Sequence, residues 1–287
     1  MSSKEMEYWK WFCETVKKER RFTIFNKFSS FNESFDSGWH TDPFSFFKGL
    51  LETILHDEEY YAFFTKGQSI FRAQRFKKEK TFKPEDFSSP PFEKAVSGRM
   101  NPQHISFFYG AIDHDTCIYE LRPGIEDEIA VASFEVKKDL LLFNLAVDVE
   151  IGAFSDEKYK GIDEWQFKLF LKEFLNNIQK PIRIADSSYE YLPTQALTEF
   201  IRIISFKDLD IFPGSDRVEE LINSKNFQGF SGIQFSSSLK RGRKNIVLFK
   251  GPEISDHNSP NQWLEYKKYE VYKINEVNYG FQKICNA

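Results

Sequence analysis

The sequence has little cysteine, no excess of positive charge and no long apolar run. Its three cysteines, Cys13, Cys117 and Cys285, lie far apart and form no CxxC pair, so neither a disulfide framework nor a zinc site is predicted. The formal net charge of −4 gives no electrostatic reason to expect binding to nucleic acid or to an anionic membrane. No apolar run reaches the roughly 18–20 residues that a membrane-spanning helix needs. Charged residues within Met1–Glu5 argue against a secretory signal, so we expect a cytoplasmic protein.

Short motifs of several enzyme classes are also absent. The chain has no GxGxxG after a strand, no GxxxxGK(S/T), no HExxH and no GxSxG, which argues against a dinucleotide-fold dehydrogenase, a P-loop enzyme and an α/β-hydrolase. No metal site is predicted either. An Asp-His-Asp segment at a helix start is usually an exposed turn, and the spacing of the candidate ligands matches no common set: His104, Asp113, His114, Asp115 and Cys117.

What the sequence does contain is enough apolar material for a full core. The 287 residues include 32 phenylalanines, which we interpret as core and packing residues. Apolar spacing predicts helices within 1–65, at 162–178 and at 193–204, and strands at 68–75, 105–109, 128–136, 140–145, 229–238, 245–249 and 266–281. Without regular βαβ repeats, this pattern predicts an α+β fold, in which a mixed β-sheet has flanking helices and an N-terminal helical region.

The predicted elements divide the chain into an N-terminal helical region at 1–65, a second domain at 66–281 and a tail at 282–287. The first region keeps helical spacing at Met6, Trp9 and Cys13 but brings together no titratable groups. We therefore expect a helical cap that packs on the second domain. Residues 77–96 are expected to form a polar loop long enough to cover a site.

The stretch from 97 to 123 predicts a turn at 98–102, a strand at 105–109 and a short helix that ends in Glu120. Either Asp113 or Asp115 can cap this helix, because a short side-chain oxygen accepts hydrogen bonds from the free amides of the first turn. The helix must stop at Pro123, because proline disfavours helical geometry in the residue before it.

Three side chains of this stretch are able to handle a charged sugar phosphate: Arg99, Tyr109 and Glu120. Outside it, Arg72 lies in the predicted strand at 68–75, and Ser236–Ser238 end another strand. Taken alone, an arginine in a strand is usually solvated, and serines at a strand end are often loop residues. The concentration of polar groups between 97 and 123 is the first indication of a functional site.

Several blocks in this order resemble the RES domain family, which is named for an arginine, a glutamate and a serine. The resemblance spans roughly residues 66–281. The family resembles ADP-ribosyltransferases in fold, and its characterised members are toxins of bacterial toxin–antitoxin pairs that destroy NAD by hydrolysis or phosphorolysis. The matching blocks are Phe71–Ala73, Gly98–Pro102, Tyr109, Glu120–Pro123, Tyr191–Gln195, Gly232–Ser237 and Asn245–Phe249.

Two positions depart from the family pattern. Phe235 stands where tyrosine is usual, and Met100 replaces a residue that is often small or aromatic. The position of the functional serine is open among Ser236, Ser237 and Ser238, and counting from Phe235 favours Ser237. The helices before residue 66 look like the extension of longer relatives.

The resemblance implies a role for each matching polar residue in cleavage of the nicotinamide–ribose bond. Glu120 would stabilise positive charge on the ribose and position or deprotonate the attacking group. Arg72 and Arg99 would bind the pyrophosphate, because arginine is a planar donor that stays charged. Tyr109 would offer its ring and its hydroxyl. The substrate would be oriented by hydrogen bonds from Ser237 and Asn245.

The expected function is therefore an NAD glycohydrolase or NAD phosphorylase that acts as a toxin in a toxin–antitoxin or defence system. NAD would be the substrate, so the resemblance implies neither a bound cofactor nor a metal ion. The other partners that we consider are inorganic phosphate, an antitoxin or regulatory protein and a second copy of the chain, with neither nucleic acid nor membrane. Two alternatives stay open: a protein ADP-ribosyltransferase, and a catalytically inactive module that senses NAD or binds a protein.

Overall fold

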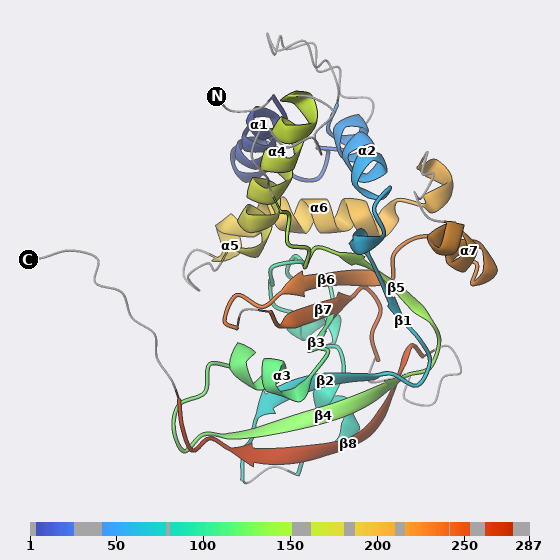
Figure 1. Ribbon diagram of the computed structural model, residues 1–287. Coiled ribbons are helices and arrows are strands. Elements are labelled where there is room, and N and C mark those ends of the chain that lie inside the picture. Colours follow the sequence, from blue (N-terminus) through green and yellow to red (C-terminus); the bar gives the residue numbers. More distant parts are fainter. Residues whose placement is uncertain are drawn as a thin grey trace, which may run out of the picture.

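The computed structural model describes residues 4–25, 42–78, 81–150, 162–180, 187–209, 216–240, 242–252 and 262–277. Within these residues, helices lie against an eight-stranded sheet that contains antiparallel and parallel pairs (Figure 1), which confirms the predicted α+β class. The strand order is β1-β5-β6-β7-β3-β2-β4-β8. The strands are β1 (Tyr61–Phe64), β2 (Ser69–Arg75), β3 (Phe108–Ala111), β4 (Glu128–Val136), β5 (Leu140–Asn144), β6 (Gly232–Ser236), β7 (Lys244–Leu248) and β8 (Leu264–Lys273).

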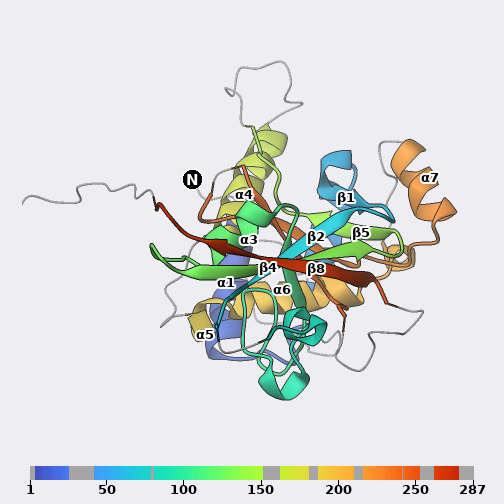
Figure 2. The same ribbon diagram turned by 90° about the horizontal axis from the view of Figure 1, so that it is seen from below.

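The sheet bends into two layers because two of its strands continue almost directly into the next strand. β1 leads into β2 through a turn at Gly67, whose φ of 94° suits a residue without a Cβ atom. β4 leads into β5 beside it, and the amide of Gly67 donates a hydrogen bond to the carbonyl oxygen of Val136 at 2.9 Å. Figures 1 and 2 show β2, β4 and β8 as one layer that crosses the layer of β5, β6 and β7.

One row of paired residues runs across four neighbouring strands. Phe235 of β6 lies opposite Asn245 of β7, which lies opposite Ala111 of β3, and Ala111 lies opposite Phe71 of β2. Helix α3 (His114–Glu120) begins shortly after β3 and packs over this end of the strands. Segments far apart in the sequence therefore meet at one place.

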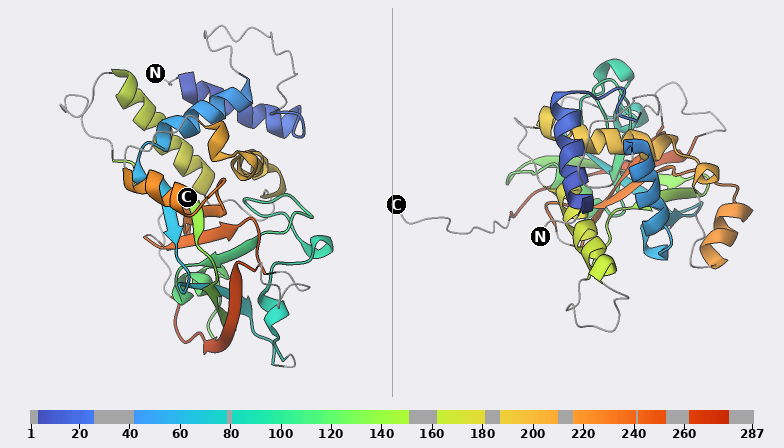
Figure 3. Two further views of the ribbon diagram at one scale, coloured as in Figure 1. Left: turned by 90° about the vertical axis from the view of Figure 1, so that its right-hand side faces the viewer. Right: turned by 90° about the horizontal axis from the view of Figure 1, so that it is seen from above.

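The larger helices pack on the outer face of β5, β6 and β7 and bury an aromatic core there. The rings of Trp9 and Phe174 lie 4.9 Å apart, and those of Phe12 and Phe47 lie 4.7 Å apart. The same core includes Phe143 of the sheet. Figures 1 and 3 show these helices at one end of the molecule: α1 (Lys4–Lys18), α2 (Pro43–Ile54), α4 (Ile162–Gln179) and α6 (Leu192–Ile203).

Shorter helices lie around this arrangement. They are α5 (Ser187–Glu190), α7 (Asp216–Ser224) and the 3-10 turns η1 (Glu58–Tyr60), η2 (Pro84–Phe87), η3 (Phe92–Lys94) and η5 (Phe206–Asp208). None of the helices in the described part of the chain is long and apolar enough to cross a membrane.

A second core fills the space between the two layers of the sheet. It contains Phe64, Phe108 and Phe134, all at least nine-tenths buried. The segment predicted as a loop at 77–96 contributes Phe82 and Phe87 to this core. Its described residues therefore cover the second core, and they do not line the cavity described below.

The strand predicted at 105–109 is displaced toward the C-terminus and forms β3 at Phe108–Ala111. The reason is the amide of Asn101, whose Nδ2 donates to the carbonyl oxygens of Val96 at 3.0 Å and Ile105 at 2.8 Å. These hydrogen bonds hold the residues after Asn101 in a turn, so the extended backbone begins later than the apolar pattern suggests.

The prediction of helical structure up to residue 65 is wrong at its C-terminal end, where Tyr61–Phe64 form β1. This segment pairs with β5 at the edge of the sheet, with Tyr61 opposite Phe143, and its aromatic side chains suit a strand. The predicted hairpin-like pair is confirmed as β6 and β7, and β8 at the edge of the sheet extends only over Leu264–Lys273. Residues 278–281 lie outside the described residues, and the domain division at residue 65 stays a prediction.

Candidate active site

A cavity of 210 Å³ lies where the row of paired residues meets α3. Polar groups and aromatic rings share its walls, and they come from β2, β3, α3, β6 and β7. The lining residues are Arg72, Ala73, Tyr109, Gly110, Ala111, Cys117, Glu120, Leu121, Phe235 and Asn245. Four of the side chains predicted to act on a substrate therefore line one cavity: Arg72, Tyr109, Glu120 and Asn245.

Glu120 is held at this cavity by the helix that precedes it. The side chain of Asp113 caps α3 by accepting a hydrogen bond from the amide of Thr116 at 2.9 Å, which confirms one of the two predicted caps. The Oε1 atom of Glu120 accepts hydrogen bonds at 2.7 Å from the Oγ of Ser237 and from the Nδ2 of Asn245. The other carboxylate oxygen, Oε2, accepts no hydrogen bond from any residue that the structure describes. One carboxylate oxygen is thus fixed while the other is available to a ligand.

Ser237 is the serine that the structure brings to Glu120. Its Oγ accepts hydrogen bonds from the amides of Leu239 and Lys240, each at 3.2 Å, so its proton is free for the carboxylate. Ser236 instead donates its backbone amide to the Oε1 of Gln179 at 2.8 Å. Both Ser237 and Asn245 are buried, with 7% and 6% of their surface exposed, which gives Glu120 two well-ordered donors.

Arg72 supplies positive charge to the cavity from β2. Its Nη1 donates to the carbonyl oxygen of Tyr109 at 3.1 Å, and its guanidinium lies 5.1 Å from the ring centroid of Phe108. Burial lowers the pKa of the guanidinium to about 10, which still leaves it charged at neutral pH. No acidic group among the described residues forms an ion pair with Arg72. The charge is therefore available to an anionic ligand.

Tyr109 contributes its ring to the cavity, but its hydroxyl is occupied. The hydroxyl donates to the Oδ1 of Asn101 at 2.7 Å and accepts from the amide of Met100 at 3.1 Å. Burial raises the pKa of this hydroxyl above its usual range, so it acts as a neutral group. Both of its hydrogen bonds go to the turn that precedes β3, and the contact of the hydroxyl with a substrate stays a prediction.

Arg99 is not brought to the cavity. Its Nη1 donates to the carbonyl oxygen of Ile178 at 2.7 Å, and its guanidinium lies 5.5 Å from the ring centroid of Tyr191. A cation in this position stabilises the C-terminal end of α4, because the helix dipole is negative there. Its contacts thus assign Arg99 to the packing of α4, and its contact with a substrate stays a prediction.

The structure adds Gln195 and Asn101, which sequence reasoning did not single out individually. The Nε2 of Gln195 donates to the carbonyl oxygens of Gly98 at 2.7 Å and Asn101 at 3.0 Å, and this side chain is 3% exposed. Gly98 has no room for a Cβ atom, which would lie 2.5 Å from the Oδ1 of Asn101 and 2.7 Å from the hydroxyl of Tyr109. The signal was present in two of the blocks that resemble the family. Gly98–Pro102 form the turn, and side chains of the Tyr191–Gln195 block donate hydrogen bonds to its carbonyl oxygens.

An acidic group also lies at the start of α3. Single ligand atoms of Asp113, His114 and Asp115 lie within 4.8 Å of one another. Arg243 forms ion pairs with Asp113 at 3.2 Å and with Asp115 at 3.7 Å, and Asp113 also caps the helix. Because this arginine already balances the two carboxylates, the group gives no reason to place a metal ion.

The fold and the site define an α+β protein whose buried serine and asparagine hold a glutamate at a small, partly aromatic cavity. The RES domain family model matches residues 69–268, so the chain belongs to the RES domain family. No curated protein and no solved structure matched the chain. Membership of this family is consistent with NAD-related, toxin-like activity.

Proposed function

We propose that this chain cleaves the bond between nicotinamide and ribose in NAD and transfers the ADP-ribose to water or inorganic phosphate. The observation that carries the proposal is the environment of Glu120. Ser237 and Asn245 donate hydrogen bonds to one carboxylate oxygen, and Glu120 lines a cavity that Arg72 also lines. This arrangement suits the stabilisation of a positive charge that develops next to a phosphate-bearing group.

The reaction needs little chemistry from the protein beyond this carboxylate. The C–N bond breaks and its electron pair goes to the nicotinamide nitrogen, which loses its positive charge. The ribose becomes oxocarbenium-like, and the carboxylate of Glu120 stabilises it. An oxygen of water or phosphate then bonds to the anomeric carbon, and in hydrolysis Glu120 takes the proton that the water releases. Because Oε1 is already hydrogen-bonded, Oε2 is the atom that we assign to these steps.

The other walls of the cavity match the nicotinamide end of the substrate. The rings of Tyr109 and Phe235 offer aromatic faces, on which a nicotinamide ring can stack. Arg72 would bind the phosphate nearer the nicotinamide ribose, because a charged guanidinium forms strong hydrogen bonds with phosphate oxygens.

Turnover of NAD by the purified protein tests the proposal, with products separated by chromatography in the presence and absence of phosphate. The expected products are nicotinamide and ADP-ribose, or ADP-ribose 1″-phosphate when phosphate is the acceptor. We expect Glu120→Gln to lower the rate by about 10²–10³-fold with the fold unchanged by circular dichroism. The matched control is Glu93→Gln, because Glu93 is exposed and lies outside the cavity. Intact NAD after incubation with folded protein would contradict the proposal.

We also propose that the reaction serves as a toxin in a toxin–antitoxin or defence system, with support from the family alone. Expression of the chain in bacteria should then lower cellular NAD and arrest growth, whereas the Glu120→Gln protein should do neither. If growth arrest occurs without loss of NAD, the toxin acts by another route. Transfer of label from tagged NAD to cellular proteins would indicate a protein ADP-ribosyltransferase.

A further inference from the structure

The cavity beside Glu120 is small for the proposed substrate. Ligand pockets commonly have volumes of about 300–1,000 Å³, whereas this cavity has 210 Å³. NAD is a dinucleotide, so the cavity has room for one end of it. The adenosine end must lie elsewhere, within the length of a diphosphate from Glu120.

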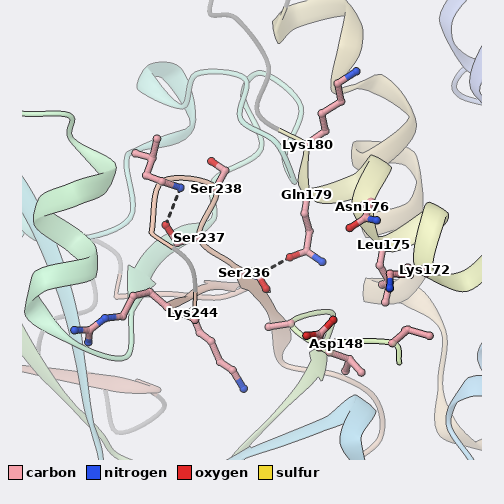
Figure 4. Close-up of a pocket in the computed structure, with 16 residues that line it drawn as sticks. Asp148, Lys172, Leu175, Asn176, Gln179, Lys180, Ser236, Ser237, Ser238 and Lys244 are labelled. Carbon is pink, nitrogen blue, oxygen red and sulfur yellow. Dashed lines mark hydrogen bonds between the residues drawn. The ribbon is translucent and has the colours of Figure 1, made fainter. Parts of the chain in front are cut away.

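A second cavity of 560 Å³ lies on the other side of Ser237 (Figure 4). Its walls are the end of α4, the segment after β5 and the turn between β6 and β7. Ser237 lines this cavity while its hydroxyl contacts Glu120, and Lys244 lines it while the next residue, Asn245, lines the first cavity. The hydrogen-bonded group of Glu120, Ser237 and Asn245 therefore lies between the two cavities.

The charge of the second cavity is positive. Four cationic residues line it, against a single acidic residue, Asp148: Lys172, Lys180, Arg243 and Lys244. The charge of Arg243 is already matched by Asp113 and Asp115. In the described part of the chain, none of the three lysines forms an ion pair. An anion in this cavity would gain from them, because like charges around a cavity repel one another until a counter-charge binds.

Two of these lysines belong to different walls of the cavity. Lys172 comes from α4 on one wall and Lys244 from β7 on the opposite wall, whereas the amino group of Lys180 is turned away from Ser236 (Figure 4). The C-terminal end of α4 would by itself repel an anion, but Arg99 donates to its carbonyl group at Ile178. The position of Arg99 therefore also favours a negative ligand beside α4.

Gln179 keeps these walls in place. Its Oε1 accepts from the amide of Ser236, and its Nε2 donates to the carbonyl oxygen of Leu145, each at 2.8 Å. The side chain thus joins α4 to the ends of β5 and β6, and Figure 4 shows it pointing toward Ser236. The second cavity is built on anchored backbone.

We propose that the second cavity binds the adenosine diphosphate end of NAD, with Lys172 and Lys244 as its phosphate-binding groups. This inference rests on the proposed function, since it names the part of the same substrate that lies beyond Glu120. It assigns to two lysines the diphosphate contact that the sequence led us to expect from Arg99. Lys172 belongs to α4 and Lys244 to the start of β7, so the contact depends on the packing of α4 beside the sheet.

Shortened substrates test the inference by kinetics. Nicotinamide mononucleotide keeps the reacting bond and one phosphate but lacks the adenosine phosphate. For the double variant Lys172→Met/Lys244→Met, we expect KM for NAD to rise about tenfold or more, with kcat nearly unchanged and KM for the mononucleotide nearly unchanged. Lys94→Met is the control, because Lys94 is exposed and lines neither cavity. An equal rise of KM for both substrates, or no rise for either, would overturn the inference.

Direct binding separates this inference from the proposed reaction. ADP lacks the reacting bond, so its affinity can be measured by calorimetry whether or not NAD is cleaved. We expect the unchanged protein and Lys94→Met to bind ADP equally, and the double variant to bind at least about tenfold more weakly. If ADP binds in this way while NAD stays intact, the cavity assignment stands and the proposed reaction fails. Equal ADP affinity in all three proteins, or no ADP binding at all, means that the assignment fails.

Discussion

At the scale of single residues, the surroundings of each polar group decide which part of it can meet a ligand. Glu120 has one oxygen fixed by two donors and one that is available. Tyr109 also lines the cavity, but its hydroxyl is hydrogen-bonded within the protein. Residue types alone would not distinguish these two cases.

We predict that Tyr109→Phe lowers stability but leaves NAD cleavage by the folded protein little changed. The substitution keeps the ring and removes the partner of two partly buried groups, the Oδ1 of Asn101 and the amide of Met100. The expected loss in the free energy of unfolding is about 1–3 kcal/mol, measured by urea titration. A variant with unchanged stability and greatly reduced turnover would show that the hydroxyl contacts the substrate after all.

A second prediction at this scale concerns Cys117 and the dependence of stability on pH. Burial raises the pKa of this thiol from the ordinary value of 9.0 to about 12. Between these values the unfolded chain loses the proton while the folded chain keeps it, so stability is fully present below pH 9 and falls as the pH rises toward 12. Through this thiol, the free energy of unfolding falls by up to about 1.4 kcal/mol for each pH unit in this range. In urea titrations from pH 8 to 11, Cys117→Ala should show a shallower decline, and an identical decline would contradict the assignment.

At the scale of elements, the site depends on a turn that is held by a helix from another part of the chain. Thr194 and Gln195 lie in the first turn of α6, and they donate hydrogen bonds to the carbonyl oxygens of Arg99 and Gly98. The same turn contains both hydrogen-bond partners of the Tyr109 hydroxyl, the amide of Met100 and the Oδ1 of Asn101. The first turn of α6 therefore positions one wall of the cavity without touching it.

We predict that Gln195→Leu lowers the free energy of unfolding by about 2–4 kcal/mol, because the carbonyl oxygen of Gly98 loses a buried donor and that of Asn101 loses one of its donors. The turn should shift, so KM for NAD should rise in the protein that remains folded. Gln103→Leu is the matched control, since Gln103 is an exposed glutamine of the same turn. Equal melting temperatures for the two variants would show that Gln195 has no positioning role.

At the scale of the whole molecule, the N-terminal helices share a core with the part of the chain that matches the RES family. Phe12 and Phe47 are fully buried in the same cluster as Phe143 and Phe200. β1 also precedes the matched residues and completes one edge of the sheet. The RES domain of this chain is therefore packed against its N-terminal extension over a continuous apolar surface.

We predict that a chain beginning at residue 66 does not reach a stable fold. Removal of α1, α2 and β1 would expose a core in which each large apolar side chain contributes about 1.5–3 kcal/mol, whereas the net stability of a domain is only about 5–15 kcal/mol. The expected result is loss of the cooperative thermal transition, measured by circular dichroism against a chain that begins at residue 4. A cooperative transition of the shorter chain would support a domain boundary near residue 65.

The sequence by itself determined the elements whose signals are local. The cap at Asp113, the strand at Glu128–Val136 and the helix that ends before Pro181 follow from hydrogen-bonding side chains, alternation and spacing within a few residues. The order of the blocks that resemble the RES family was also enough to suggest that family, which the family model then matched. Only the tertiary structure decided which serine meets Glu120, that the Tyr109 hydroxyl is occupied, that Arg99 turns to α4 and that a cationic cavity adjoins the site. These outcomes depend on strand register and helix packing, which join residues about a hundred positions apart, as Ser237 and Glu120 are, and no local pattern specifies such contacts.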